Sequence, residues 1–181
     1  MIGNDIVDLA LSRTESNWKR KGWVQKIFTA IEQHYIFEAD HPEIQVWKFW
    51  SMKEAVYKAH QRRFGHPPKY NPKDFNCTLG GEVMIDKCVY KTSTIITEKY
   101  IYSIAKASNI EYDTQIFDET LRMHPLLLQK IAENYKIDSS IVTIKKDGNG
   151  IPMVRIDQKA EDIPISITHH GQYSAFVIGL E

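Results

Sequence analysis

Hydrophobic and polar positions divide the first third of the chain into a short strand followed by two helices. The opening residues MIGNDIVDL are rich in Ile and Val and predict a short buried strand that ends in acids. Residues 12–23 are polar. Thr29 and Glu32 have the spacing of a capping box, which predicts a helix running to about residue 39. Asp40-His41-Pro42 interrupts the chain, and Pro42 suits the first turn of a longer helix that ends near residue 63.

The rest of the chain is dominated by strand patterns. After a loop rich in Gly and Pro, short runs at residues 75–79, 82–86, 88–91 and 100–107 predict an antiparallel meander. Residues 117–135 predict a third helical region, with Pro125 starting a fresh segment. A hairpin is predicted at Asp147-Gly148-Asn149-Gly150 between runs at residues 141–145 and 151–156, and runs at 163–168 and 173–178 close the chain.

This order of strand, helices, strands, helix and strands predicts an α+β fold, with antiparallel sheets packed against a long helix. We expect a single domain over residues 1–181, with possible lobes at residues 1–108 and 109–181, because residues 108–118 could separate two halves.

Composition excludes several classes of protein. The formal net charge is +0, which gives no general reason to bind nucleic acid or membranes. Cys77 and Cys88 have neither metal-site nor disulfide-framework spacing, so we expect reduced thiols. The acidic start does not resemble a signal peptide, and no apolar run approaches the ~20 residues of a membrane span. The sequence therefore predicts a soluble, cytoplasmic protein that binds neither nucleic acid nor membrane.

The long helix carries charge beside an apolar face. Trp47, Ser51, Glu54 and Lys58 fall on one helical stripe, next to a stripe of bulky apolar residues. A glutamate and a lysine spaced like Glu54 and Lys58 commonly form an exposed ion pair that contributes about 0.2–0.5 kcal/mol to helix stability. A carboxylate beside tryptophans is costly to bury without a cation, and Mg²⁺ would need a second oxygen ligand. Asp5, at the end of the first strand, is the candidate.

These residues also carry a resemblance. Gly3, Asp5 and Ile6 match a Gly-x-Asp-aliphatic motif. Trp50, Lys53, Glu54 and Lys58 match Trp-x-x-Lys-Glu-x-x-x-Lys, and Phe28, Thr29 and Glu32 match a preceding Phe-Thr-x-x-Glu. Ser166, Thr168, His169 and Gly171 match Ser-x-Thr-His-x-Gly near the end of the chain. Together they resemble the signature set of the 4′-phosphopantetheinyl transferases.

The resemblance implies a reaction and its partners. Members transfer 4′-phosphopantetheine from coenzyme A to a serine of an apo acyl or peptidyl carrier protein, with Mg²⁺ as cofactor and 3′,5′-ADP as leaving group. We expect this fold and this enzyme activity here. The alternative is a non-catalytic module of the same fold that binds coenzyme A or a carrier protein.

The resemblance also implies roles for residues. Asp5 and Glu54 would bind Mg²⁺, and Asp5, Glu54 and Lys58 would be the catalytic group, with Asp8 a reserve candidate. Coenzyme A would be bound by six residues: Lys53, Lys58, Ser166, Thr168, His169 and His170. A water relayed from Glu54 or Asp5 is the expected path for the serine proton, although the general base stays open.

Three departures from the family pattern affect the expected site. Val7 stands where larger members carry a third acid. His170 replaces a usual serine and is expected either to donate to phosphate or to face solvent. Ile151 stands where a lysine near the coenzyme is frequent, and Lys145 or Lys146 could replace that charge.

Motif order places the chain between two family types. The order resembles the small acyl-carrier-protein synthases, which implies holo-acyl-carrier-protein synthase activity in fatty acid biosynthesis, although the carrier stays open. The later strands resemble the larger two-lobed type. We therefore favour a monomer that completes its site within one chain, with a homotrimer as the alternative. Basic clusters at Lys19-Arg20-Lys21 and Arg62-Arg63 could steer an acidic carrier protein.

Overall fold

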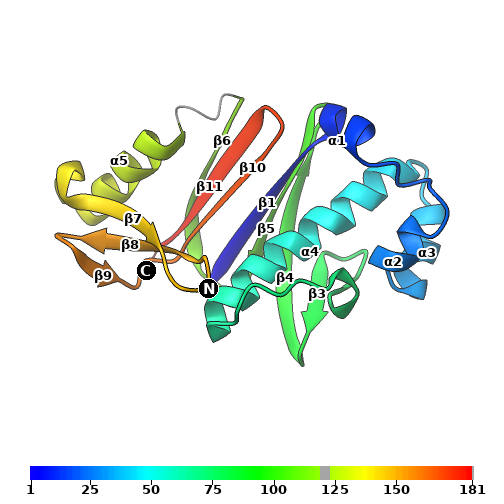
Figure 1. Cartoon of the computed structure of the whole chain (residues 1–181), viewed down its shortest axis with the longest axis horizontal. Coiled ribbons are helices and arrows are strands. Elements are labelled where there is room, and N and C mark those ends of the chain that lie inside the picture. Colours follow the sequence, from blue (N-terminus) through cyan, green and yellow to red (C-terminus); the bar gives the residue numbers. More distant parts are fainter. Residues whose placement is uncertain (119–122, 181) are drawn as a thin grey trace.

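The computed structural model describes residues 1–118 and 123–180. It shows an elongated α+β molecule in which antiparallel sheets meet near the middle (Figure 1). The helices are α1 (Leu9–Glu15), α2 (Trp23–Ile27), α3 (Ala30–Phe37), α4 (Pro42–Phe64) and α5 (Met123–Tyr135), with 3-10 turns η1 (Pro72–Asp74) and η3 (Ser139–Ile141). The strands are β1 (Ile2–Asp8), β2 (Asn76–Cys77), β3 (Glu82–Ile85), β4 (Cys88–Ile96), β5 (Tyr100–Lys106), β6 (Glu111–Phe117), β7 (Val142–Lys146), β8 (Pro152–Ile156), β9 (Lys159–Glu161), β10 (Ile165–His170) and β11 (Tyr173–Leu180).

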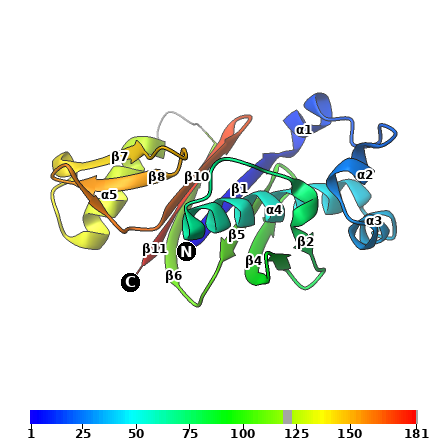
Figure 2. The same cartoon turned by 60° about the horizontal axis from the view of Figure 1, so that its bottom comes forward.

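The strands form three sheets among the described residues. The first has the order β1-β5-β4-β3-β2, the second β10-β11-β6 and the third β7-β8-β9, and neighbouring strands are antiparallel in all three. Helices α1 to α4 accompany the first sheet, and α5 lies with the other two (Figures 1 and 2). None of the described helices combines the length and apolar character that a membrane span requires.

Strand β1 is buried on both faces. All seven of its residues are buried. Its Gly3, Asp5 and Val7 face α4, while Ile2 and Ile6 join an apolar cluster with residues of β5 and β11. Asp5 therefore points toward the helix that carries Glu54.

The edge strands β1 and β10 lie side by side and run in the same direction, as Figures 1 and 2 both show. They are joined through side chains: the amides of Asn4, Ile6 and Asp8 donate to Ser166 Oγ (3.2 Å), Thr168 Oγ1 (3.3 Å) and His170 Nδ1 (2.8 Å). Every second side chain of β10 thus satisfies a backbone N–H of β1 that would otherwise be buried without a partner. This contact joins the first sheet to the second.

Gly3 sets the distance between β1 and α4. A Cβ at this position would collide with the carbonyl oxygen of Ala55 and lie 2.6 Å from the nitrogen of Ala59. Glycine is therefore needed for the strand backbone to approach the helix backbone closely. Because Asp5 follows two residues later on the same face, this approach also brings Asp5 to the helix.

Several predicted elements are confirmed, and others need correction. The α+β class, the first strand, the capping box of α3, the span of α4 and the 147–150 hairpin match the structure. Sequence reasoning missed α1, α2, β9 and β6, which lies within residues 108–118, and ended β4 five residues early. The predicted helix at 117–135 begins at Met123, because Phe117 ends β6; residues 119–122 of that prediction lie outside the described chain.

Candidate active site

Asp5 is a buried carboxylate in which one side-chain oxygen accepts hydrogen bonds and the other accepts none from the described residues. Its Oδ1 accepts from Thr168 Oγ1 (3.2 Å) and from Lys58 Nζ (3.3 Å). Ser51 fixes the backbone by donating to the Asp5 carbonyl at 3.2 Å. Oδ2 is buried and receives no hydrogen bond within residues 1–118 and 123–180. Burial raises the pKa of Asp5, and Lys58 and Thr168 only partly offset this rise.

Glu54 lies on α4 beside Asp5. Burial and the charge of Asp5 together raise its pKa to about 7, although Lys58 acts in the opposite direction. No described residue donates a hydrogen bond to its carboxylate. Two neighbouring carboxyl groups whose pKa values are both raised form a site that gains stability when a cation joins them.

Lys58 follows Glu54 by one helical turn and crosses to β1. Its Nζ donates to the Asn4 carbonyl (2.9 Å) and to Asp5 Oδ1 (3.3 Å), and its side chain remains 27% exposed. An ammonium group has three N–H donors. One donor therefore remains for a ligand beside the two acids.

A cleft of about 500 Å³ opens in front of these three residues. Its walls come from α4, from β10 and from the segment Gly150-Ile151-Pro152 of the β7–β8 hairpin. That hairpin is held against α4, because Gln61 donates to the Asn149 carbonyl at 3.1 Å and Arg62 donates to Pro152. The cleft thus lies between elements that are far apart in the sequence.

The cationic side chains of the cleft include one, that of Arg62, which sequence reasoning did not assign to the coenzyme. Arg62 lines the cleft together with Lys58 and Lys146, although only external steering was predicted for Arg62. Its position could have been found, since it continues the i, i+4 series of Glu54 and Lys58 along the helix. Lys146 lines the cleft as one of the two predicted replacements for the lysine absent at Ile151.

Strand β10 brings its predicted residues to different places. Ser166, Thr168 and His169 line the cleft, but the oxygens of Ser166 and Thr168 already accept from β1. His169 is exposed. His170 lies outside this cleft: its Nδ1 accepts from Asp8, and its Nε2 lies 3.4 Å from Glu15 Oε2.

The structure does not support the coenzyme-binding role predicted for Lys53. Its side chain is fully buried, and its Nζ donates to Glu32 Oε2 (2.8 Å), to Pro72 O (2.9 Å) and to Phe75 O. All three N–H groups are used inside the core, so none is left for coenzyme A. The lysine and Glu32 of the two motifs form a buried structural pair.

Asp8 is a helix cap. Its Oδ1 accepts from the amides of Ala10 and Leu11, and its Oδ2 accepts from Gln172. Gly171 must be glycine here, because its φ is +60° and a Cβ would lie 2.8 Å from Asp8 Cγ. Asp8 is thus not free to bind a metal.

The model of one protein family, the 4′-phosphopantetheinyl transferase superfamily, matches residues 1–105. The chain belongs to this superfamily. The matched range runs from the start of the chain into β5 and includes Asp5, Glu54 and Lys58, whereas β10 lies outside it. A comparison with curated proteins found no match. The resemblance deduced from the motifs is therefore confirmed at the level of the superfamily, and the α+β fold is the one expected of it.

The donor set of this superfamily member suits a hard divalent cation. Asp5 Oδ2 is a buried oxygen without a hydrogen-bond partner, and the half-buried Glu54 carboxyl group, whose pKa the charge of Asp5 helps to raise, lies beside it. Mg²⁺ takes one or two carboxylates and completes its shell with water and phosphate oxygens. Asp5 and Glu54 could hold such an ion at the mouth of the basic cleft.

A second cleft meets the first at the same acids. It has a volume of about 330 Å³ and shares Asp5, Glu54 and His169 with the first. Its other walls are largely apolar and include Trp23, Trp47 and Trp50. The acid pair therefore stands between a basic cleft and an apolar one.

Proposed function

We propose that the chain transfers 4′-phosphopantetheine from coenzyme A to the serine of an apo acyl or peptidyl carrier protein and releases 3′,5′-ADP. The observation that carries the proposal is the Asp5 and Glu54 pair, with the unsatisfied Oδ2 of Asp5, at the junction of a basic and an apolar cleft. Such a junction suits a reaction between a polyanionic donor and a separate acceptor. The motif order favours the holo-acyl-carrier-protein synthase type.

The basic cleft would take the nucleotide of coenzyme A. Lys58, Arg62 and Lys146 place positive charge along it, and His169 stands at the end of β10 where a phosphate could accept from it. Positive charge fixed around a diphosphate is the main contribution that proteins make to phosphoryl transfer. The free N–H of Lys58 would donate to the diphosphate and stabilise charge on the departing ADP.

Asp5 and Glu54 would hold Mg²⁺ through their unpartnered oxygens. When bound, the ion would neutralise the diphosphate oxygens as charge develops on the leaving group. The serine oxygen would form the new bond to phosphorus while the bond to 3′,5′-ADP breaks. We assign the serine proton to a relay through water toward Glu54 or Asp5.

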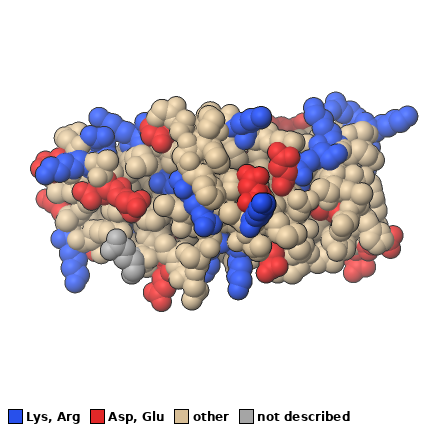
Figure 3. All heavy atoms as spheres, turned by 90° about the horizontal axis from the view of Figure 1, so that it is seen from below, with Lys and Arg blue, Asp and Glu red and all other residues tan. Residues whose placement is uncertain are grey.

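The carrier protein would approach over the apolar cleft. This cleft reaches α1, α2 and the segment between them, where Lys19, Arg20, Lys21 and Lys26 are exposed. Figure 3 shows Lys and Arg gathered along the upper edge of the end of the molecule that α1 to α3 form, while Asp and Glu lie at the lower edge of that end and both signs of charge are mixed elsewhere on that face. An acidic carrier would be steered to this end, and faster at low salt.

Mass spectrometry tests the activity. A panel of apo acyl and peptidyl carrier proteins is incubated with coenzyme A, Mg²⁺ and the chain, and one carrier should gain the mass of a single phosphopantetheine. The gain should disappear with Glu54→Gln. Calorimetric binding of coenzyme A without any transfer across the panel would instead support the non-catalytic alternative.

A further inference from the structure

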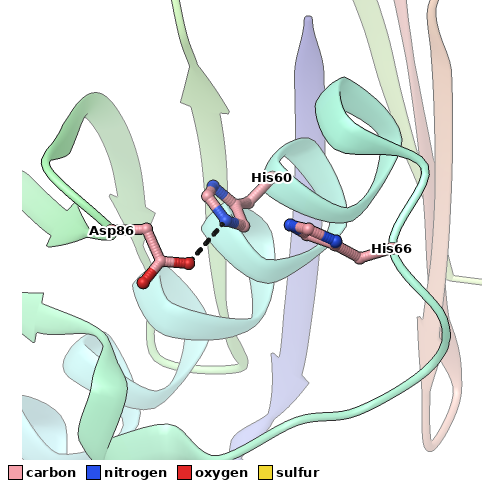
Figure 4. Close-up of side chains that lie close together, drawn as sticks. All are labelled: His60, His66 and Asp86. Atoms are coloured by element: carbon pink, nitrogen blue, oxygen red, sulfur yellow. Dashed lines mark ion pairs between the residues drawn. The ribbon is translucent and has the colours of Figure 1, made fainter.

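Two histidines and an aspartate converge near the C-terminal end of α4. His60 comes from the last turns of α4, His66 from the loop after it, and Asp86 from the β3–β4 turn (Figure 4). Each offers one ligand atom, and the three atoms lie within 4.8 Å of one another. Figure 4 shows the three side chains pointing toward a common centre.

His60 is the buried member of this cluster. Its ring is buried, and its Nδ1 lies 3.0 Å from the hydroxyl oxygen of the buried Tyr90. Its Nε2 lies 3.3 Å from Asp86 Oδ2, an ion-pair contact (Figure 4) that lacks the geometry of a full hydrogen bond, and no other described residue satisfies this buried nitrogen. Leaving a buried ring nitrogen unsatisfied is costly unless another partner occupies it.

The orientation is that of a metal-binding histidine. With the proton on Nδ1, His60 donates to Tyr90, and the lone pair of Nε2 points at the centre of the cluster. Histidines that bind metals commonly have the other ring nitrogen fixed by such a hydrogen bond. In that tautomer the contact with Tyr90 orients the ring and leaves Nε2 free to bind a metal ion.

We propose that His60, His66 and Asp86 bind one divalent transition-metal ion of the zinc type. Two imidazoles and one carboxylate suit Zn²⁺, whereas Mg²⁺ prefers oxygen ligands throughout. In a tetrahedral site the ligand atoms lie about 3.4 Å apart, as follows from metal–ligand distances of about 2.1 Å. His66 and Asp86 are both exposed, so their side chains can close the remaining distance by rotating.

The site would keep an open position. A cavity of about 260 Å³ adjoins the three residues. Lys69 and Asp74, which carry charges of opposite sign, both lie on its wall. A zinc ion with three protein ligands takes water or a small ligand as its fourth. The bound ion would tie the β3–β4 turn to the end of α4, and this inference does not depend on the proposed transferase activity.

Cobalt titration tests the site, because tetrahedral Co²⁺ gives strong visible absorption and replaces Zn²⁺ in such sites. The full chain with Glu54→Gln is used, so that the Asp5 and Glu54 pair does not compete. One equivalent of Co²⁺ should bind with the tetrahedral spectrum, Zn²⁺ should displace it, and Zn²⁺ should raise the unfolding temperature.

His66→Asn and Asp86→Asn provide the decisive variants, since both positions are exposed and their folding can be verified by circular dichroism. Each should weaken Co²⁺ binding at least tenfold and abolish the thermal shift caused by Zn²⁺. His124→Asn, at an exposed histidine outside the cluster, should leave both unchanged. Binding that is absent in the parent, or that is unaffected by His66→Asn and Asp86→Asn, would overturn the proposal.

Discussion

Thr168 donates its hydroxyl hydrogen to Asp5 Oδ1 at 3.2 Å, although 163 residues separate the two in the sequence. Thr168 Oγ1 also accepts from the Ile6 amide, so this one side chain joins β10 to β1 and orients the acid. The proposed metal ligand is thus positioned by the strand that closes the chain.

Thr168→Val should therefore weaken both folding and activity. The valine has the same shape but leaves the buried Ile6 amide without a partner, which typically costs about 1–3 kcal/mol. Asp5 also loses a donor, so transferase activity should fall by more than the loss of folded protein explains. Urea unfolding and carrier modification would measure the two effects. Thr168→Ser keeps the hydroxyl, and if it behaved like the valine variant this role would be wrong.

Gly3→Ala should separate β1 from α4. The added Cβ meets the backbone of Ala55 and Ala59, which cannot move aside as a flexible side chain could. Overpacking of this kind costs roughly 1–3 kcal/mol. Gly148→Ala is the matched control, because a Cβ there meets nothing within 4 Å. Equal unfolding free energies for the two variants, measured in urea, would contradict the close approach.

Lys53→Met should reduce stability without altering coenzyme affinity. The change leaves Glu32 buried without its cation, which commonly costs about 3–5 kcal/mol. Thermal unfolding measures this loss, and calorimetry below the unfolding transition measures coenzyme A binding. Folded Lys53→Met protein that bound coenzyme A much more weakly would restore the direct contact that the motif suggested.

Lys146 and Lys145 offer a paired test of the basic cleft. Neighbouring residues of a strand face opposite sides, and of these two Lys146 lines the cleft. Lys146→Ala should raise the KM for coenzyme A by about 2- to 10-fold, corresponding to roughly 0.5–1.5 kcal/mol for a partly exposed charged contact. Lys145→Ala should change it little, and the opposite ranking would place the coenzyme elsewhere.

Glu54 should make the stability of the metal-free chain fall as pH rises. Its pKa is about 7 in the folded chain and lower in the unfolded chain, where the ordinary value is 4.5. Between these values the folded state keeps a proton that the unfolded state has lost, so the free energy of unfolding decreases through about pH 5 to 7. At about 1.4 kcal/mol per pKa unit, the decrease approaches 3 kcal/mol.

Glu54→Gln isolates this effect. The variant should be more stable than the parent at pH 8 by about 1–3 kcal/mol and nearly equal to it at pH 5. Urea unfolding with EDTA at several pH values provides the comparison, in which Asp5 contributes to both proteins. A difference between them that stays constant with pH would show that Glu54 is not desolvated.

The strongest local patterns predicted their elements well. The capping box of Thr29 and Glu32, the first-turn Pro42 and the Asp147–Gly150 turn each mark a boundary through short-range chemistry, and each is found in the structure. Strand β6 was missed because its residues are largely exposed or half-buried and its order comes from pairing with β11. Such pairing is a long-range property that a local pattern does not carry.

The site was predicted less evenly than the fold. Asp5, Glu54 and Lys58 lie together as expected, because Gly3 and the helical spacing determine their positions. Lys53 was misassigned because the motif shows a charge but not its depth, and its position on α4 faces the core. Ser166 and Thr168 reach the cleft, but their hydrogen bonds to β1 became visible only once the two edge strands were placed together.

The most direct measurement is anomalous diffraction from crystals grown with Mn²⁺ in place of Mg²⁺ and with coenzyme A. The account predicts a manganese peak within bonding distance of Asp5 Oδ2 and a Glu54 carboxylate oxygen, with the diphosphate of coenzyme A on the same ion. Bound coenzyme A with both carboxylates free of metal, or with the manganese elsewhere, would contradict it.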